Sequence, residues 1–373
     1  MRLPPVVGLV VLLAAGCGGG AAPQPAQHED GEIRVGAIIS QTGVYAMLGD
    51  EMEQAMRLYL EENGGELGGR PARLVVADDG GSAEQGRRAA ARLIERDRVD
   101  VITGLLASPV AEAVTDHARN AGTPVVVANA GADGLGGPGV YRVSFTNHEH
   151  GHAAGRYAAE QYAGRRVVLM ASDYSAGIET LDGFEEGYGA GELPRILTPY
   201  GRTPDLAPYL ERIPRDAELL YAFYAGGEAV AFAKAFRQLG YDARIDLLTC
   251  QHLTDEDVLS AVGRDAEGIV SVAAYAPGLE NPENTAFVAK WQTRTGQNPS
   301  VVAVQSWDAM RLVDLAVARG GDLTTALDRV RALPSPRGTL RLDPGTHDPV
   351  QNWYARQYQN GTNRVIATIP PKE

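Results

Sequence analysis

The chain has 373 residues, of which 44% are hydrophobic and 22% charged, and its formal net charge at pH 7 is −13. This composition is typical of a globular protein that is long enough to form two domains of ordinary size. Binding of nucleic acid needs a basic surface, so the acidic balance argues against nucleic acid as a partner. The cysteines, Cys17 and Cys250, lie far apart in the sequence and imply no disulfide framework.

The N-terminus has the features of an export signal. Residues 1–16 contain one early positive charge and an apolar run, Leu3–Ala15, that is too short to span a bilayer. Small residues before Cys17 resemble a bacterial lipoprotein signal, in which this cysteine is lipidated; the alternative is a secretory signal with an incidental cysteine. The polar, Gly/Pro-rich residues 17–31 favour a flexible tether. We therefore expect an extracytoplasmic protein held at the cell membrane by a lipid anchor only.

The most informative stretch is Val99–Gly131, which predicts a strand, a tight loop, a helix and a second strand. Ser108 stands where an N-cap belongs, with Pro109 at the first helical position. The end of such a helix offers free N–H groups and a positive dipole, which suit a carboxylate or amide oxygen of a small ligand. Ser108 is therefore either a ligand contact or simply the cap of its own helix.

Alternating strands and helices continue along the chain. The preceding elements are a strand over Ile33–Ser40, a loop over Tyr45–Gly49, a helix over Asp50–Asn63, a strand over Arg70–Asp79 and a helix over Ala83–Arg96. A second series has strands over Val167–Met170, Arg195–Tyr200, Leu219–Phe223, Ile245–Leu248 and Gly268–Ala274, separated by helices that end near Tyr188, Ile213, Gly240 and Val262. The end of the chain predicts helices over Pro282–Thr295, Ser300–Arg319 and Thr324–Leu333, followed by strands over Gly338–Leu342, Asn352–Gln359 and Arg364–Ile369.

This pattern predicts an α/β fold with two doubly wound, Rossmann-like lobes and a ligand cleft between them. Helices that belong with the first sheet follow the second sheet in sequence, so we expect the chain to cross the hinge three times. The expected lobes are residues 32–146 with 276–350, and residues 147–275 with 351–373.

Several segments together resemble the branched-chain amino acid-binding family of ABC-importer receptors, which has the type I periplasmic binding fold. They are Ile33–Asp50, the strand–Ser108–helix unit, Asp173–Gly177, Gly338–Asp348 and Gln351–Tyr354. The resemblance implies a protein that closes its lobes on a small solute. Catalytic motifs are missing from the sequence, so we expect no enzymatic activity, and we expect no cofactor. We expect a monomer that delivers the solute to a membrane permease, or alternatively a sensory domain of the same fold.

The resemblance also implies the ligand-contacting positions. On the first lobe these are Ser108 with its neighbour Ala107, and the backbone around Asn129, Ala130 and Gly131, which would hold a carboxylate. An aromatic from the second lobe falls on Tyr174. Tyr45 and Tyr224 are further candidates, Tyr224 lying beside Ala225, which aligns with a position that is usually aromatic.

Several positions depart from the family pattern. Acids that usually face the ligand's ammonium fall on Asn147 and Gln251, both neutral amides, and Gly131 replaces an expected hydroxyl. A desolvated ammonium needs a compensating charge, which an amide does not supply. The sequence therefore predicts a ligand without a free ammonium, such as a small carboxylate, an amide or an aromatic acid.

Other signals favour ordinary structural roles. His148, His150 and His152 invite a metal site, but on a helix start they point to different sides, so we expect solvated polar residues. Cys250 is either a reactive thiol or, as we expect, a small buried residue of the pocket wall. The glycine-rich Ala132–Gly139 lacks a Gly-Lys-Ser/Thr ending and is no phosphate loop. Motifs of hydrolases are missing from the sequence.

Overall fold

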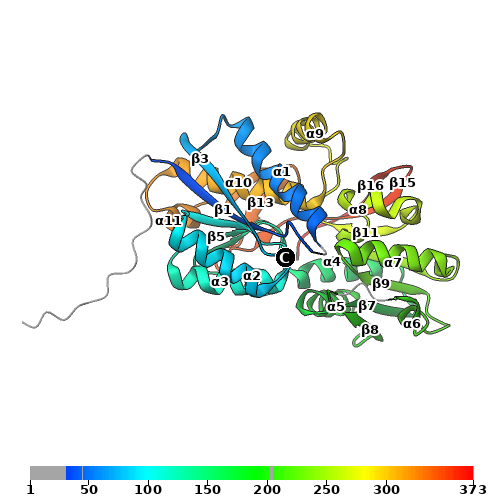
Figure 1. Ribbon diagram of the computed structural model, residues 1–373. Helices are drawn as coiled ribbons and strands as arrows, with labels where there is room; N and C mark the ends of the chain where they lie inside the picture. The colour runs from blue at the N-terminus through cyan, green and yellow to red at the C-terminus, as the bar shows by residue number, and fades with distance from the viewer. Residues whose placement is uncertain (1–30, 44, 202–204, 373) are drawn as a thin grey trace, which may run out of the picture.

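The computed structural model describes residues 31–43, 45–201 and 205–372. The predicted signal peptide, Cys17 and all but the last residue of the predicted tether lie outside these ranges. Two sheets with their helices form the two halves of the molecule, which lie side by side in Figure 1. We call them the first and the second lobe. This arrangement confirms the predicted α/β fold.

The first lobe is built on a six-stranded sheet. In spatial order its strands are β2 (Glu66–Leu67), β3 (Arg70–Asp78), β1 (Ile33–Ile39), β4 (Val101–Gly104), β5 (Val125–Val127) and β6 (Val140–Arg142). Its helices are α1 (Ala46–Glu62), α2 (Ala83–Ala91), which continues as the π-helical turn η1 (Arg92–Arg96), α3 (Ser108–Ala121), α9 (Pro282–Thr295), α10 (Val301–Arg319) and α11 (Leu323–Asp328). All pairs but β2–β3 are parallel, and both faces of the sheet are covered.

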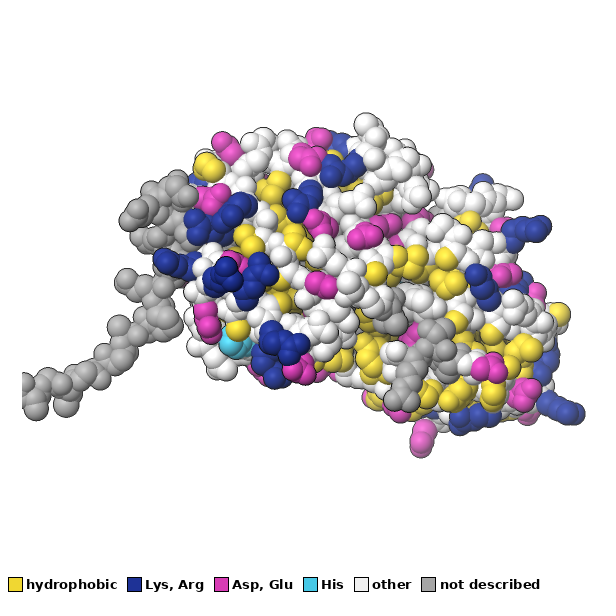
Figure 2. Space-filling view, in the orientation of Figure 1, with side chains coloured by type: hydrophobic (Ala, Val, Ile, Leu, Met, Phe, Trp, Pro, Cys, Tyr) yellow, Lys and Arg dark blue, Asp and Glu magenta, His cyan; other side chains and the backbone are white. Residues whose placement is uncertain are grey.

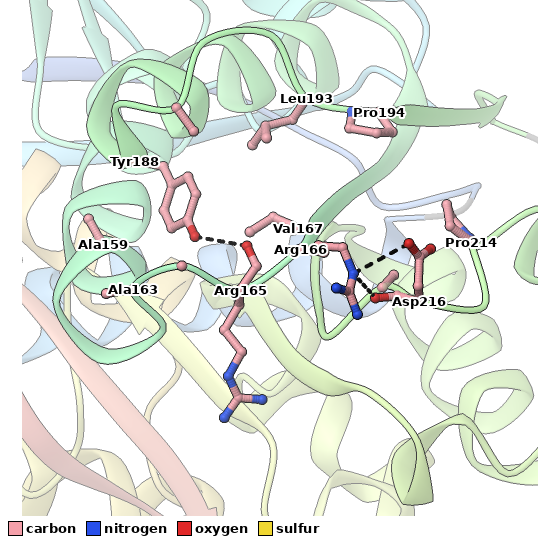
Figure 3. Close-up of a pocket in the computed structure, with 13 residues that line it drawn as sticks. Ala159, Ala163, Arg165, Arg166, Val167, Tyr188, Leu193, Pro194, Pro214 and Asp216 are labelled. Carbon is pink, nitrogen blue, oxygen red and sulfur yellow. Dashed lines mark hydrogen bonds and ion pairs between the residues drawn. The ribbon is translucent and has the colours of Figure 1, made fainter.

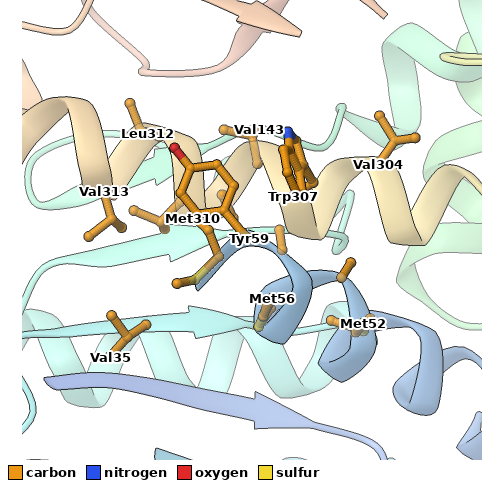
Figure 4. Close-up of a cluster of buried hydrophobic side chains, with 14 of the residues drawn as sticks. Val35, Met52, Met56, Tyr59, Val143, Val304, Trp307, Met310, Leu312 and Val313 are labelled. Atoms are coloured by element: carbon orange, nitrogen blue, oxygen red, sulfur yellow. The ribbon is translucent and has the colours of Figure 1, made fainter. Parts of the chain in front are cut away.

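The larger core of this lobe lies between α1 and α10 and one face of the sheet. Met52, Met56 and Tyr59 of α1 meet Trp307 and Met310 of α10 above the sheet (Figure 4). The rings of Tyr59 and Trp307 pack edge to face with centroids 4.7 Å apart. On the opposite face, α2 and α3 pack against the side chains that alternate with these along the strands.

The second lobe is built on a seven-stranded sheet. In spatial order its strands are β16 (Thr362–Ile369), β15 (Trp353–Gln359), β11 (Val270–Ala273), β10 (Asp246–Cys250), β9 (Leu219–Phe223), β7 (Val167–Asp173) and β8 (Arg195–Pro199). One face is covered by α4 (Asn147–Gln161) and α5 (Ser175–Tyr188), the other by α6 (Ala207–Leu210), α7 (Gly226–Gln238) and α8 (Glu256–Val262). Short 3-10 turns are η2 (Tyr241–Ala243), η3 (Gln251–Leu253) and η4 (Gly263–Ala266).

The chain passes between the sheets after β6, after β11 and after a small antiparallel sheet of β12 (Ala332–Ser335), β13 (Gly338–Leu342) and β14 (Pro349–Val350). Buried Arg337 connects two of these passages. Its guanidinium donates to the carbonyl of Val143 and to Gln351 Oε1, and it pairs with Asp308 at 2.8 Å. Tyr354 donates back to the Arg337 carbonyl at 3.0 Å.

Three predicted boundaries were wrong. The segment Tyr45–Gly49 is not a loop, because α1 already begins at Ala46 and Gly49 packs against the backbone of Ser40. Ser108 is not an N-cap, since Ala107 holds that position and Ser108 is the first helical residue. The helix expected to reach Leu333 ends at Asp328, because Leu333 faces the core from strand β12.

Candidate functional site

A small cavity of about 30 Å³ lies where the carboxyl ends of strands from both sheets face each other. Ligands of open α/β sheets bind at this end of the strands. The residues that line it are Tyr45, Leu48, Leu106, Ala107, Ser108, Asn129, Gly131, Phe145, Asn147, Tyr174, Ala176, Phe223, Ala225 and His252. None of these described lining residues carries a formal charge when the histidine is neutral.

Helix N-termini converge on this cavity. Tyr45, Ala107, Tyr174 and Ala225 are the N-cap residues of α1, α3, α5 and α7, and all of them line it. None of these four N-caps has a side-chain capping hydrogen bond. The positive ends of several helix dipoles therefore point to one small space, which favours an anionic group there.

Ser108 and Asn147 form the polar part of the wall between the lobes. The Asn147 amide nitrogen lies 3.4 Å from Ser108 Oγ and donates to Glu179 Oε2 at 2.8 Å. The backbone N–H of Asn147 donates to the carbonyl of Gly131 at 2.6 Å. A Cβ at Gly131 would lie 2.3 Å from Asn147 Oδ1 and 2.5 Å from Phe145, so a hydroxyl-bearing residue does not fit there.

The carboxyl group of Glu179 lies behind the Asn147 amide. It also accepts the Asp133 backbone N–H at 3.1 Å. Burial raises its pKa above the ordinary value, while the hydrogen bond from Asn147 opposes the shift. Glu179 does not itself line the cavity and is linked to it by the Asn147 amide.

Three tyrosines lie together at one side of the cavity, and two of them, Tyr45 and Tyr174, line it. The rings of Tyr174 and Tyr200 stack with centroids 4.1 Å apart, and the hydroxyl of Tyr45 from the first lobe interacts with both. Burial holds the pKa of Tyr45 well above its ordinary value, so its hydroxyl stays protonated. The cluster therefore offers neutral hydroxyls and flat ring surfaces from both lobes.

The structure brings seven of the ten predicted contacts to the cavity and leaves three outside its lining. Ala130 is buried, and its carbonyl accepts from Ser144 Oγ at 2.6 Å. Tyr224 points away into the core, where it stacks on Phe232 and its hydroxyl lies 3.2 Å from Thr198. The Gln251 side chain is held by the backbone N–H of Ala274 at 3.0 Å.

The residues that sequence reasoning missed are mostly neighbours of predicted ones. His252 follows Gln251, and Ala225 follows Tyr224. Phe223 ends β9 of the second lobe and follows an apolar run, which was a usable signal, whereas Phe145 lies in the passage between β6 and α4. Both rings belong to the core of the second lobe and line the cavity.

The histidine cluster does not converge. His148 and His152 lie near Glu186, whereas His150 is buried, stacks on Trp353 at 4.8 Å and contacts the Val272 carbonyl. Among the described residues no group of three or more His, Cys, Asp or Glu side chains is placed to hold a metal ion.

Cys250 is fully buried and its thiol donates to the Tyr224 carbonyl at 3.3 Å. Burial raises the pKa of this thiol to about 11. It therefore lacks the thiolate character that a reactive cysteine needs.

A larger groove, about 610 Å³, lies at the opposite end of the second-lobe sheet (Figure 3). Val167 at the start of β7 and Leu193 before β8 contribute to its wall, and Arg166 pairs with Asp216 at its rim. It is far in sequence and topology from the strand ends that meet between the lobes.

On the face shown in Figure 2, Lys and Arg side chains lie among Asp and Glu over both lobes.

Comparison with known proteins places these features in a family. Residues 32–363 match the family model described as periplasmic binding protein. A curated relative, a Leu/Ile/Val-binding protein homologue from Brucella melitensis, is 28% identical over 358 residues, covering 90% of this chain and 91% of the relative. In the described part of the chain, no helix has the length and apolar character needed to span a bilayer.

Two solved structures are more similar in sequence. A solute-binding protein of an ABC transporter from Rhodopseudomonas palustris, in complex with benzoate, is 33% identical with a TM-score of 0.85, covering 91% of this chain and 97% of that one. A second, from R. palustris BisB5 in complex with 3,4-dihydroxybenzoic acid, is 30% identical with a TM-score of 0.85, covering 92% and 98%. These similar proteins are solute-binding proteins and not enzymes.

Proposed function

The chain belongs to the periplasmic binding protein family, and from this premise we propose that it captures an aromatic monocarboxylate by lobe closure. As a member of that family it is an extracytoplasmic solute-binding protein of an ABC transporter. Its ligand, its membrane anchor and its permease are proposed here.

One observation carries the ligand proposal: an aromatic-walled cavity without formal charge on its described lining receives four uncapped helix N-termini. A carboxylate finds N–H groups and the Ser108 hydroxyl there. A flat ring finds Phe145, Phe223 and Tyr174. The benzoate and dihydroxybenzoate bound by the two R. palustris proteins support the same ligand class.

An amino acid fits this cavity less well. Its ammonium would face the Asn147 amide, whose N–H already donates to Glu179. Gln251, the second predicted partner, is held outside the lining by Ala274. Burying an ammonium without a partner of opposite charge costs far more than a hydrogen bond to an amide returns.

We propose the lobe division predicted from the sequence, residues 32–146 with 276–350 and residues 147–275 with 351–373. The passages between the sheets and the Arg337 contacts support these bounds. The ligand would stabilise the closed state through Ser108 on one lobe and Tyr174 on the other.

Lipidation of Cys17, monomeric behaviour and delivery to a membrane permease complete the proposal. They rest on the N-terminal sequence and on the family. The alternative, a sensory domain of the same fold, differs in its membrane partner and not in its site. Co-purification with a permease complex from native membranes separates the two roles.

A thermal-shift panel tests the ligand class. Benzoate and its hydroxylated forms are expected to raise the melting temperature of the mature protein, and leucine and isoleucine are not. Asn147→Asp, which places a carboxylate in the cavity wall, is expected to abolish the benzoate shift, whereas Asn63→Asp on the exposed end of α1 retains it. A shift with leucine and none with benzoate overturns the proposal.

A further inference from the structure

One residue of the cavity wall has a buried polar atom without a partner. His252 is only 7% exposed and lines the cavity from the turn η3, and its buried Nδ1 has no hydrogen-bond partner within the described residues. A buried polar atom without a partner is costly, and native structures usually satisfy it with water or a ligand. Because His252 lines the cavity, a polar group of the bound molecule is the candidate partner of this atom.

The neighbouring residue sets which hydrogen-bonding role this atom has. Gln251 Oε1 accepts the backbone N–H of Ala274 at 3.0 Å, which turns its Nε2 toward His252. That amide nitrogen lies 3.5 Å from His252 Nε2 and can only donate. His252 Nε2 is then the acceptor, so the proton of the neutral ring is on Nδ1.

The ring stays neutral at ordinary pH. Burial, together with the nearby charge of Arg356, lowers the pKa of His252 to about 4, although Asp255 opposes the shift. The ring centroid lies 6.0 Å from that of Phe145 and 6.4 Å from that of Phe223. Such surroundings suit a neutral oxygen on an aromatic ring better than a carboxylate, which needs more than one donor.

We propose that His252 Nδ1–H donates to a ring hydroxyl of the ligand and makes the site selective for hydroxylated aromatic acids. Gln251 is the positioning residue that fixes the donor tautomer. This inference rests on the proposed function and deepens it. The helix N-termini bind the carboxylate of the ligand, and His252 recognises the hydroxyl on its ring.

A comparison of three ligands on two proteins tests the selectivity. Calorimetry is done with benzoate, 3-hydroxybenzoate and 4-hydroxybenzoate on the wild type and on His252→Phe. At least one hydroxylated acid is expected to bind the wild type about 3- to 10-fold more tightly than benzoate, as one neutral hydrogen bond provides. His252→Phe should remove that preference, so that this variant binds the hydroxylated acids no more tightly than benzoate.

The outcomes separate the two proposals. Benzoate binding without any preference for a hydroxyl, or an equal loss for all three acids in His252→Phe, overturns the role of His252 and leaves the ligand class standing. Binding of none of these acids overturns the ligand class and, with it, the selectivity.

A ligand-free measurement tests the tautomer and does not depend on folding of a variant. ¹⁵N–¹H NMR of the wild type at pH 7 is expected to show His252 protonated on Nδ1 and not on Nε2. Gln251→Glu, which offers only acceptors, is expected to move a proton to Nε2. A wild-type ring protonated on Nε2 contradicts the inference.

Discussion

The position of Ser108 in the structure distinguishes between its two predicted roles, a ligand contact and a helix cap. A serine at the start of a helix usually caps it, but here Ala107 is the N-cap and no side-chain capping bond is present in α3. The hydroxyl of Ser108 instead lines the cavity, 3.4 Å from the Asn147 amide. The structural reading of this serine is therefore wrong, and its contact with a ligand remains our proposal.

Ser108→Ala is expected to weaken benzoate binding about 10-fold or more, because a hydrogen bond to a charged group is lost. The free energy of unfolding should change by less than about 0.5 kcal/mol, since no cap is removed. Calorimetry and urea unfolding measure the two quantities.

Thr115→Val is the matched control on the same helix. The buried Thr115 hydroxyl donates to the Ala111 carbonyl at 2.8 Å and does not line the cavity. This variant should change stability and leave affinity unaltered. A Ser108→Ala protein with full affinity would remove Ser108 from the site.

At the scale of elements, α4 and α5 pack through glycines. Gly151 and Gly155 of α4 face Gly183 and Gly187 of α5, and a Cβ at any of them would lie 1.9–2.2 Å from a backbone oxygen of the other helix. This close approach fixes the start of α4, where Asn147 lies, against the start of α5, where Tyr174 lies. The glycines thus position two residues of the cavity.

Gly151→Ala should destabilise the protein by about 1–3 kcal/mol through overpacking, although alanine is the better helix former. Ala159→Gly in the same helix measures the effect of helix propensity alone, which is a loss of about 1 kcal/mol in the free energy of unfolding. Denaturant unfolding of both variants gives the comparison. If Gly151→Ala leaves the free energy of unfolding unchanged or raises it, the close approach of α4 and α5 is not required for stability.

Helices and strands were predicted well where the pattern of neighbouring residues determines them. Runs such as Val125–Val127 and Leu219–Phe223 are continuous in apolar residues and buried on both faces, so their strands follow from the sequence. Strand β12 was missed because Leu333 is held by tertiary contacts with the core and not by a helical pattern.

The residues of the cavity were predicted only in part, because some of them are placed by tertiary structure and not by a local pattern. Strand ends locate Ser108 and Tyr174 near the cleft. The path of the turn η3 decides that His252 and not Gln251 reaches the cavity, and no periodicity encodes a three-residue turn.

At the scale of the whole molecule, acidic groups from both lobes meet beside the hinge. Asp255 of the second lobe accepts the Val301 N–H at the start of α10 at 2.7 Å, and Ser300 donates to Glu51 of α1. Buried Arg356 pairs with Asp255 at 2.9 Å. The described structure therefore joins its lobes at this point through a crowded set of carboxyl groups.

Glu51 should make stability depend on pH. Burial, with repulsion from Asp255, raises its pKa to about 7, although the hydrogen bond from Ser300 lowers it. The native protein then holds a proton that an unfolded chain, with a pKa of about 4.3, has released. Its contribution to the free energy of unfolding therefore falls as pH rises from about 4.3 to about 7, by at most about 1.4 kcal/mol per unit, and is constant above.

Glu51→Gln keeps the shape and removes this titration. Urea unfolding at pH 5, 6, 7 and 8 should show the variant gaining stability relative to the wild type up to about pH 7. A difference between the two proteins that is the same at every pH contradicts the assignment.

The central claim is that this cavity accepts an aromatic carboxylate and not an amino acid. Calorimetric titration of the mature protein with benzoate and with leucine, under one set of conditions, tests it most directly. We predict that benzoate binds at least ~100-fold more tightly than leucine, a difference of about 2.7 kcal/mol. Submicromolar binding of leucine or valine, with no heat from benzoate, would contradict it.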